Sequence, residues 1–187
     1  MRIINILHED RELASRFLAV LGRGLTIAGQ GKSARPGFFI FGCGFIHEYL
    51  EAIYFKKEKV LLDALADCGF PADDGPVGAM NSDLQKSREI SNALFDAAKQ
   101  WQSGDEAGRA DVIWATSEYS GMMHRHFDML KSLIHPLLEQ SLSPDDEEKA
   151  AEELNRLAFQ GYIPENLDKY IKMVETLEEE VDNWKAA

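Results

Sequence analysis

The feature that most constrains this fold is the spacing of three to four residues between apolar side chains along nearly the whole chain. This spacing is typical of amphipathic helices, and no segment shows the alternation of a half-buried strand. Glycine and proline interrupt it in three short segments, GQGKSARPG (29–37), GFPADDGP (69–76) and SGDEAG (103–108). We therefore expect four long helices, from about residue 3 into the late twenties and over about residues 36–68, 76–102 and 108–140.

The segment SLSPDDEEKAAEEL (141–154) carries a strong helix start signal. Ser143 is a suitable N-cap, Pro144 suits the first turn, and the acidic residues that follow interact favourably with the helix dipole. We expect this helix to end near residue 159, and a last acidic helix to follow over about 164–184. Four long helices with short connections favour an all-α fold. The prediction is one domain, residues 1–187, made of an antiparallel up-down-up-down four-helix bundle (about 3–140) and additional C-terminal helices (about 143–185).

The composition narrows the classes of partner and compartment. The formal net charge is −12, and such a surface repels nucleic acid phosphates and anionic membranes. The longest apolar run, GFFIFGCGFI (37–46), is too short to span a bilayer. Cys43 and Cys68 lie in apolar helical sequence, which indicates buried thiols in a reducing compartment. Because MRIINILHEDRE has no secretory signal pattern, we expect a cytoplasmic protein with no nucleic acid or membrane partner.

Histidines are the first candidates for chemistry, because helical bundles build metal sites from inward-facing His and carboxylate side chains. The chain has five: His8, His47, His124, His126 and His135. One histidine taken alone is more often structural than a ligand. From α-helical spacing, His124 and His135 are expected to lie off the inward face that carries His126.

Four segments follow one another in a recognisable order and spacing. They are ILHEDRE (6–12), FIHEYLEAIYFKKEKVLL (45–62), ADCGFPADDGPVGAMNSDLQKSRE (66–89) and HRHFDMLKSLIHPLLEQSLSP (124–144). Over roughly residues 4–145 the chain resembles the hemerythrin-like (HHE cation-binding) domain family. The resemblance implies a non-haem di-iron site with His and carboxylate ligands from all four helices.

Carried over by position, the resemblance retains a ligand type at three places, which are His8, Glu58 and His126. Tyr54 stands where the second helix would offer a histidine. The two remaining ligand positions hold leucines, Leu84 and Leu130.

A leucine side chain has no atom that can coordinate a metal, whereas a bridged pair of irons needs many nitrogen and oxygen ligands. Three ligands with one open position suit a single Fe or Zn ion instead. Phenolate from Tyr54 is a candidate fourth ligand, since tyrosine binds ferric iron in some haem proteins. The alternative for Tyr54 is a core aromatic residue with a hydrogen-bonded hydroxyl. The cofactor prediction is one or two non-haem iron ions, with zinc, or no metal, as alternatives.

A second set of polar residues shares the inward stripes of the helices. The first level consists of His8, Tyr54, Leu84 and His126. Steps of seven residues along the four helices lead from it to a second level, formed by His47, Tyr119, Ser15 and Ser91. Glu12, Glu51 and Arg88 lie between the two levels. Glu12, His47 and Glu51 are therefore reserve metal ligands, and Cys43, one turn before His47, is a weaker candidate. The alternative is an ion-pair network in which Arg88 neutralises Glu12 or Glu51, because burying unpaired charge is costly.

Two functions of different class follow. The first is a metal-binding hemerythrin-like protein with an altered non-haem iron site that binds or senses a small diatomic ligand such as O₂ or NO, or handles iron. The second is a metal-free four-helix-bundle interaction or regulatory module, because apolar replacement is how a vacated core position is filled. No substrate pocket is identified and an enzyme is not expected, although an oxidase with tyrosine-ligated iron is a third hypothesis. The sequence names no protein partner.

Overall fold

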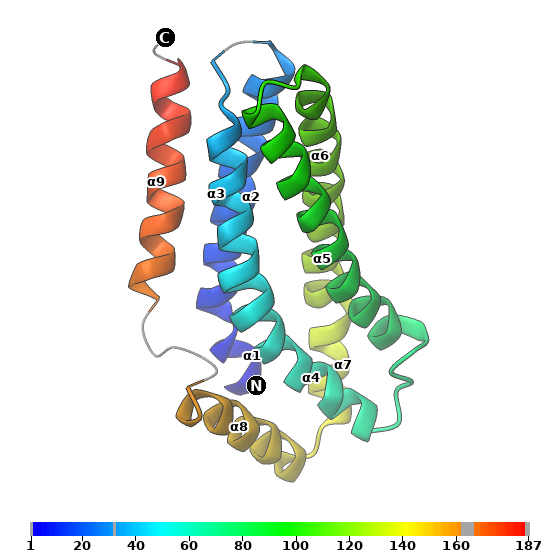
Figure 1. Cartoon of the computed structure of the whole chain (residues 1–187). Coiled ribbons are helices and arrows are strands. Elements are labelled where there is room, and N and C mark those ends of the chain that lie inside the picture. The colour runs from blue at the N-terminus through cyan, green and yellow to red at the C-terminus, as the bar shows by residue number, and fades with distance from the viewer. Residues whose placement is uncertain (1, 32, 162–166, 186–187) are drawn as a thin grey trace.

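The computed structural model describes residues 2–31, 33–161 and 167–185, and every regular element in these ranges is a helix. The prediction of an all-α fold is confirmed. Four long helical segments lie side by side (Figure 1). They are α1–α2 (Arg2–Ile6, His8–Gly29), α3–η1–α4 (Pro36–Phe45, Ile46–Tyr54, Phe55–Asp67), α5 (Gly75–Gln102) and α6–η2–α7 (Glu106–Met129, Leu130–Ile134, His135–Ser141).

The connections form where the sequence predicts them. The turn after α2 contains Gly31 at φ +82° and Ser33 at φ 52°, and Pro36 then opens α3. Asp74 caps α5 by accepting from the Gly75 N–H, and Asp105 caps α6 by accepting from the Ala107 N–H. These short connections make successive long segments run antiparallel.

Two of the long segments contain π-helix, which α-helical spacing does not predict. In η2 the N–H of His135 donates to the Leu130 carbonyl, five residues back. Pro136 gives a physical reason, because its ring lacks an N–H and clashes with the carbonyl four residues earlier in an α-helix. The wider turn relieves that clash. It also moves every later side chain of this segment by one residue relative to the α-helical face.

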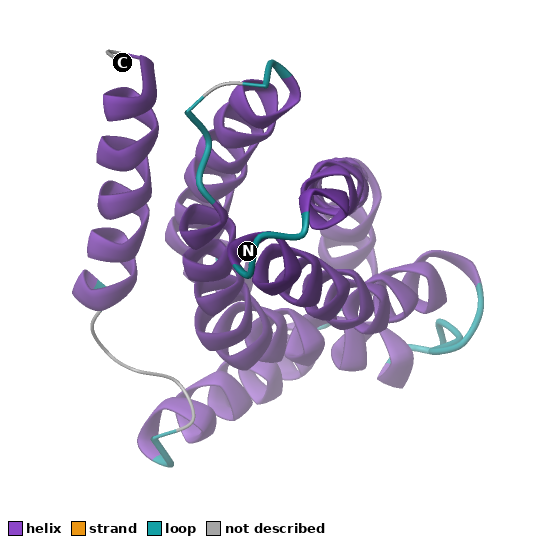
Figure 2. Ribbon diagram, turned by 45° about the horizontal axis from the view of Figure 1, so that its top comes forward, coloured by secondary structure: helices purple, strands orange, loops and turns teal. Residues whose placement is uncertain are grey.

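The C-terminal helices α8 (Pro144–Phe159) and α9 (Asp168–Lys185) pack on the end and the side of the long segments (Figures 1 and 2). Ser143 and Asp146 form the capping box that starts α8, so the predicted N-cap is confirmed. The predicted start of the last helix, at residue 164, lies outside the described residues.

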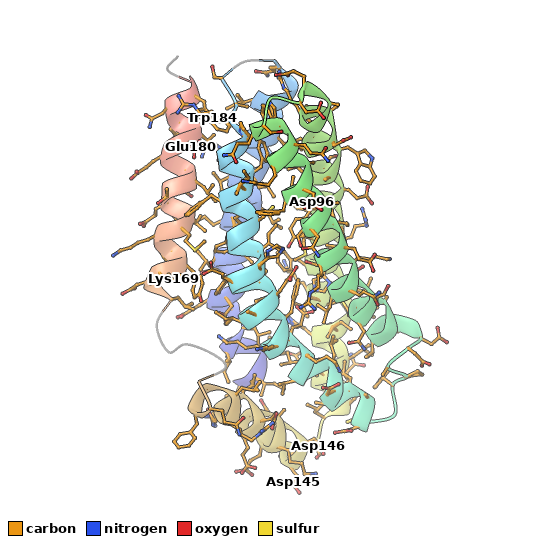
Figure 3. The ribbon with its side chains drawn as sticks, viewed as in Figure 1. Asp96, Asp145, Asp146, Lys169, Glu180 and Trp184 are labelled. Atoms are coloured by element: carbon orange, nitrogen blue, oxygen red, sulfur yellow. The ribbon has the colours of Figure 1, made fainter. Side chains whose placement is uncertain are left out.

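Helix α9 lies against α2 and α3, with Lys169 and Trp184 near its opposite ends (Figure 3). The Trp184 ring is 4.9 Å from that of Phe38, and the Arg16 guanidinium donates to Glu178 at 2.5 Å. Val174 and Leu177 are fully buried. The C-terminal helix therefore belongs to the same hydrophobic core as the four long segments.

One helix among the described residues, Pro36–Asp67, is long and apolar enough to cross a membrane. Most of its apolar window, 61%, is buried inside the protein. The core helix of a soluble protein shows burial of this kind.

Candidate functional site

The candidate site is centred on His126, a fully buried residue of α6. Its Nε2 lies 2.8 Å from Oε1 of Glu58 on α4, and its Nδ1 lies 3.3 Å from Oδ2 of Asp83 on α5. The Glu58 side chain is also fully buried, whereas that of Asp83 is 17% exposed. Three of the long segments thus contribute one ionisable side chain each, with Glu58 at one nitrogen of the His126 ring and Asp83 at the other.

Tyr54 joins this cluster from the last position of η1. It is fully buried, and it lies four residues before Glu58, which places both side chains on one face of the same helix. Burial, and then the nearby Glu58 carboxylate, raise the pKa of the Tyr54 hydroxyl well above its ordinary value. The structure therefore brings together three of the predicted ligands, Tyr54, Glu58 and His126.

Aromatic rings surround the cluster. The Phe55 and Phe127 rings each lie 5.9 Å from the His126 ring, and Phe127 meets Tyr54 edge-on at 5.9 Å. Leu130 and Leu84 stand at the two positions where the resemblance implies a metal ligand. Leu130 is fully buried, and Leu84 is partly buried against the core. The polar side chains of Tyr54, Glu58 and His126 therefore lie in apolar surroundings, where electrostatic interactions are stronger than in water.

The charge on His126 depends on its two carboxylate neighbours. Burial acts to lower the pKa of this imidazole, but Glu58 and Asp83 outweigh it and raise the pKa to about 9. In the metal-free protein His126 is accordingly a cation between two anions. Such a triad is stable only while both carboxylates remain in place, because an uncompensated buried charge is costly.

Four donor atoms in this cluster lack a hydrogen-bond partner. They are the Tyr54 hydroxyl, both carboxylate oxygens of Glu58 and Nε2 of His126. At 2.8 Å, Nε2 and Oε1 are close enough for an ion pair, yet they are not aligned for a hydrogen bond. The Tyr54 hydroxyl and Nε2 of His126 both lie within reach of the Glu58 carboxylate, so the three groups can satisfy one another or share one ion. Two ligands of one tetrahedral ion, each about 2.1 Å from it, lie about 3.4 Å apart, so Nε2 and Oε1 would have to separate by about half an ångström to bind one.

The first helix contributes differently from the prediction. The side chain of His8 is 55% exposed and that of Glu12 is 69% exposed, and they pair with each other at 3.7 Å on the surface. The inward stripe of this segment instead runs through Leu7, Asp10 and Leu13. His8 and Glu12 are therefore not brought together with the other predicted ligands.

Asp10 is a buried residue that the sequence reasoning missed. It is 1% exposed, it accepts from the Tyr49 hydroxyl at 2.8 Å, and its other oxygen meets the Lys57 ammonium at 2.7 Å. A signal was present in the sequence, because Asp10 is spaced three residues from each of two buried leucines, Leu7 and Leu13, on one helix face.

The second polar level forms around Ser91 and lies nearer to solvent. Nε2 of His47 is 3.1 Å from the Ser91 hydroxyl, and that hydroxyl donates to Glu51 at 3.0 Å. Arg88, whose side chain is 70% exposed, reaches Glu51 at 3.4 Å. The structure thus shows the hydrogen-bonded ion network that the sequence offered as the alternative here, with Glu51 rather than Glu12 as the acid.

Other members of this level make separate contacts. Tyr119 is fully buried and accepts from the Ser87 hydroxyl at 3.3 Å, while Ser15 is exposed on α2. Cys43 donates weakly to the Ser91 carbonyl at 3.6 Å. Burial, and then Glu51, raise the pKa of this thiol to about 12, so it is a poor ligand or nucleophile at neutral pH.

The π-turn η2 places His135 differently from the prediction, which put it off the inward face that carries His126. Because the turn adds one residue, His126, Leu130 and His135 follow one another along one helix face at steps of four and five residues. His135 is half-buried, and its Nε2 is buried without a hydrogen-bond partner. Burial, and then Arg11, lower the pKa of His135, while Glu58 acts in the opposite direction. His124 is exposed, as predicted.

Within the described ranges, no three His, Cys, Asp or Glu side chains are grouped as they would be around a metal ion. A metal site in this cluster therefore depends on Tyr54 as its third donor. Comparison with known proteins finds no matching family model, no matching curated protein and no matching solved structure.

Proposed function

We propose that this chain binds one metal ion, iron before zinc, in an altered hemerythrin-like site whose ligands are Tyr54, Glu58 and His126. One observation carries the proposal: the Tyr54 hydroxyl and Nε2 of His126 both face the buried Glu58 carboxylate in an apolar part of the core, and the described residues offer these atoms no other hydrogen-bond partner. Phenolate, carboxylate and imidazole together suit a ferric ion, and carboxylate with imidazole also suits zinc. A pair of irons does not fit, because Leu84 and Leu130 cannot donate and His8 faces solvent.

Each surrounding residue has a defined task in this proposal. Asp83 accepts from Nδ1 of His126, which fixes the ring and directs Nε2 toward Glu58. Phe55, Phe127 and Leu130 keep water out. When bound, iron supplies an open coordination position for a small diatomic ligand such as O₂ or NO. The role is therefore binding or sensing of such a ligand, or iron handling, rather than catalysis on a larger substrate.

A second candidate function is supported by a separate observation. The 2.8 Å approach of Glu58 to His126 is also that of a direct ion pair, and His126 is balanced by Asp83 on its other side. A buried Glu58 carboxylate that is compensated by a protonated histidine in this way needs no metal. The chain would then be a metal-free interaction or regulatory module.

Metal analysis separates the two candidates. The protein is purified without chelator, supplied anaerobically with Fe²⁺, exposed to air and desalted, and then its iron content and visible spectrum are measured. We expect one iron per chain and a tyrosinate-to-ferric charge-transfer band. Tyr54→Phe should lose the band, whereas Tyr119→Phe, which removes another fully buried tyrosine hydroxyl, should keep it. Protein that remains iron-free and zinc-free after this treatment overturns the proposal in favour of the metal-free module.

A further inference from the structure

Helix α9 lies along one side of the long segments, on a surface formed by α2 and α3 (Figures 1 and 2). Its buried stripe advances by four, three, four and three residues, which is the heptad spacing of a coiled coil. The members of the stripe are Tyr170, Val174, Leu177, Val181 and Trp184. Helix α9 is therefore held as an amphipathic helix on a helical surface, a mode of contact that also joins separate chains.

Ion pairs flank this stripe in the C-terminal half of α9. The Arg16 guanidinium of α2 donates to both carboxylate oxygens of Glu178, at 2.7 and 2.5 Å, and Arg23 of α2 pairs with Asp182. Bidentate contacts between arginine and carboxylate add geometric specificity to their charge. These two arginines make the surface of α2 complementary to an acidic helix.

The charges are reversed at the other end of α9. There Lys169 donates to Glu48 of η1, the segment that continues α3 (Figure 3). Because α9 carries a cation at one end and acids at the other, it fits this surface in one direction only. We call the surface the α2–α3 face, and its contact residues are Arg16, Arg23, Phe38 and Glu48.

The charge of the chain favours the α9 of a second copy as a partner for this face. The formal net charge of −12 makes two copies repel each other over most of their surface. The pairing of Arg16 and Arg23 with an acidic helix is a complementary contact that each copy both offers and can fill. Exchange of an identical element between two copies forms the same contacts again, so it is a low-cost route to a dimer.

The chain between α8 and α9 is long enough for such an exchange. Helix α8 ends at Phe159 and α9 begins at Asp168, so eight residues, 160–167, connect them. Eight residues reach roughly 28 Å when fully extended. A tether of this length gives α9 an effective concentration on the order of 1 mM at its own face. Exchange therefore competes with the contact inside one chain as the protein concentration approaches that value.

We propose that the α2–α3 face binds α9 of a second copy of this chain, so that two copies exchange their C-terminal helices and form a dimer. The interface of that dimer is the one already present within a single chain, with the second copy's α9 in place of the first. The proposal does not rest on metal binding, so its test is independent of the proposed function.

Charge reversal on the two sides of the interface tests the exchange in the full-length chain. Arg16→Glu/Arg23→Glu gives a face that repels its own acidic α9, and Glu178→Arg/Asp182→Arg gives an α9 that its own face repels. When the two variants are mixed, each α9 meets a face of opposite charge only in the other chain. Molar mass is measured by size-exclusion chromatography with light scattering, and helix content by circular dichroism.

We expect the mixture to form a one-to-one dimer whose Kd is at least about tenfold lower than that of the wild type, because repulsion within each chain is exchanged for attraction between chains. Either variant alone should stay monomeric at the same concentration. The matched control carries all four substitutions, which restores the ion pairs within one chain with their charges reversed, and it should dimerise as weakly as the wild type. The wild type itself should show dimer at about 1 mM.

A mixture that remains monomeric while both variants stay helical overturns the proposal, because the face then accepts α9 only within its own chain. A wild type that is wholly monomeric at about 1 mM overturns it for the native chain. Dimerisation of either variant alone to the same extent as the mixture also overturns it, because another surface is then responsible. If one variant loses helix content, recovery of that content on mixing supports the exchange, and failure to recover it overturns the exchange.

Discussion

The protein contains two pairs of histidine and glutamate inside its long helical segments, and they differ in burial. His126 and Glu58 are completely enclosed, and their facing atoms lack hydrogen-bond partners. His47 and Glu51 share the Ser91 hydroxyl, and Glu51 also meets an Arg88 that is mostly in solvent. The same two residue types therefore form a fully buried ion pair at one level and a partly exposed hydrogen-bonded network at the other.

This difference in burial and hydrogen bonding decides which of the two levels is the better candidate for a metal site. A satisfied polar network needs nothing further, whereas unpartnered donors in a low-dielectric core carry a cost that a ligand can relieve. The metal proposal is therefore placed at the level of His126 and not at that of His47. It follows that the two levels should respond very differently to the same substitution.

The largest difference is expected from replacing each histidine by leucine in metal-free protein. His126→Leu leaves the buried Glu58 carboxylate without its cation, and it should lower the free energy of unfolding by about 3–5 kcal/mol at pH 7. His47→Leu only removes one hydrogen bond near the surface and should cost about 1 kcal/mol. Urea denaturation of the two variants measures both values.

A further arm of the same experiment tests the cause. The loss should become smaller in His126→Leu/Glu58→Leu, which removes the buried carboxylate together with the imidazole. Equal losses in His126→Leu and His47→Leu, or a loss in His126→Leu that the second substitution does not reduce, would contradict the contrast between the levels.

A somewhat smaller effect is expected from pH in the wild-type protein kept in chelator. The pKa of His126 is raised from 6.5 to about 9 in the folded state, so folding is favoured by binding a proton at this site. The stabilisation is complete below about pH 6.5 and is lost as the pH rises through about 9, for a total of about 3 kcal/mol.

Denaturation midpoints between pH 6 and pH 10 measure this loss. His47→Leu serves as the matched control and should show the same alkaline loss as the wild type. His126→Gln should lack this component, because glutamine does not titrate. An unchanged alkaline slope in His126→Gln would show that other groups cause the loss.

The fold could be predicted from the sequence because its signals are local. The break at Pro36 and the cap at Ser143 act over a single turn, and apolar spacing defines the long helices between such signals. Within the site, Tyr54 and Glu58 were correctly placed on one face because they lie four residues apart in one helix.

The rest of the site depends on features that local spacing does not contain. His8 was taken as a ligand from the resemblance and Asp10 was not considered. The rotation of the first segment is set by packing against the core, and that packing turns His8 to solvent and Asp10 inward. His135 was placed off the inward face because α-helical spacing takes no account of a π-turn, although Pro136 was a signal for one. Asp83 was missed as a partner of His126 because it comes from another helix.

The smallest effect is expected at the solvent edge of the His47 level. The Arg88 side chain is 70% exposed and meets the Glu51 side chain, which is 8% exposed, at 3.4 Å, and a contact this long to a mostly solvated cation contributes little. Arg88→Ala should therefore lower the free energy of unfolding by no more than about 0.5 kcal/mol, and the difference should disappear in 1 M NaCl because salt screens exposed charges. Urea denaturation at low and high salt measures it. A loss above about 1 kcal/mol that persists in salt would mean that Glu51 depends on Arg88 as a buried charge depends on its partner, and the two levels would then be electrostatically alike.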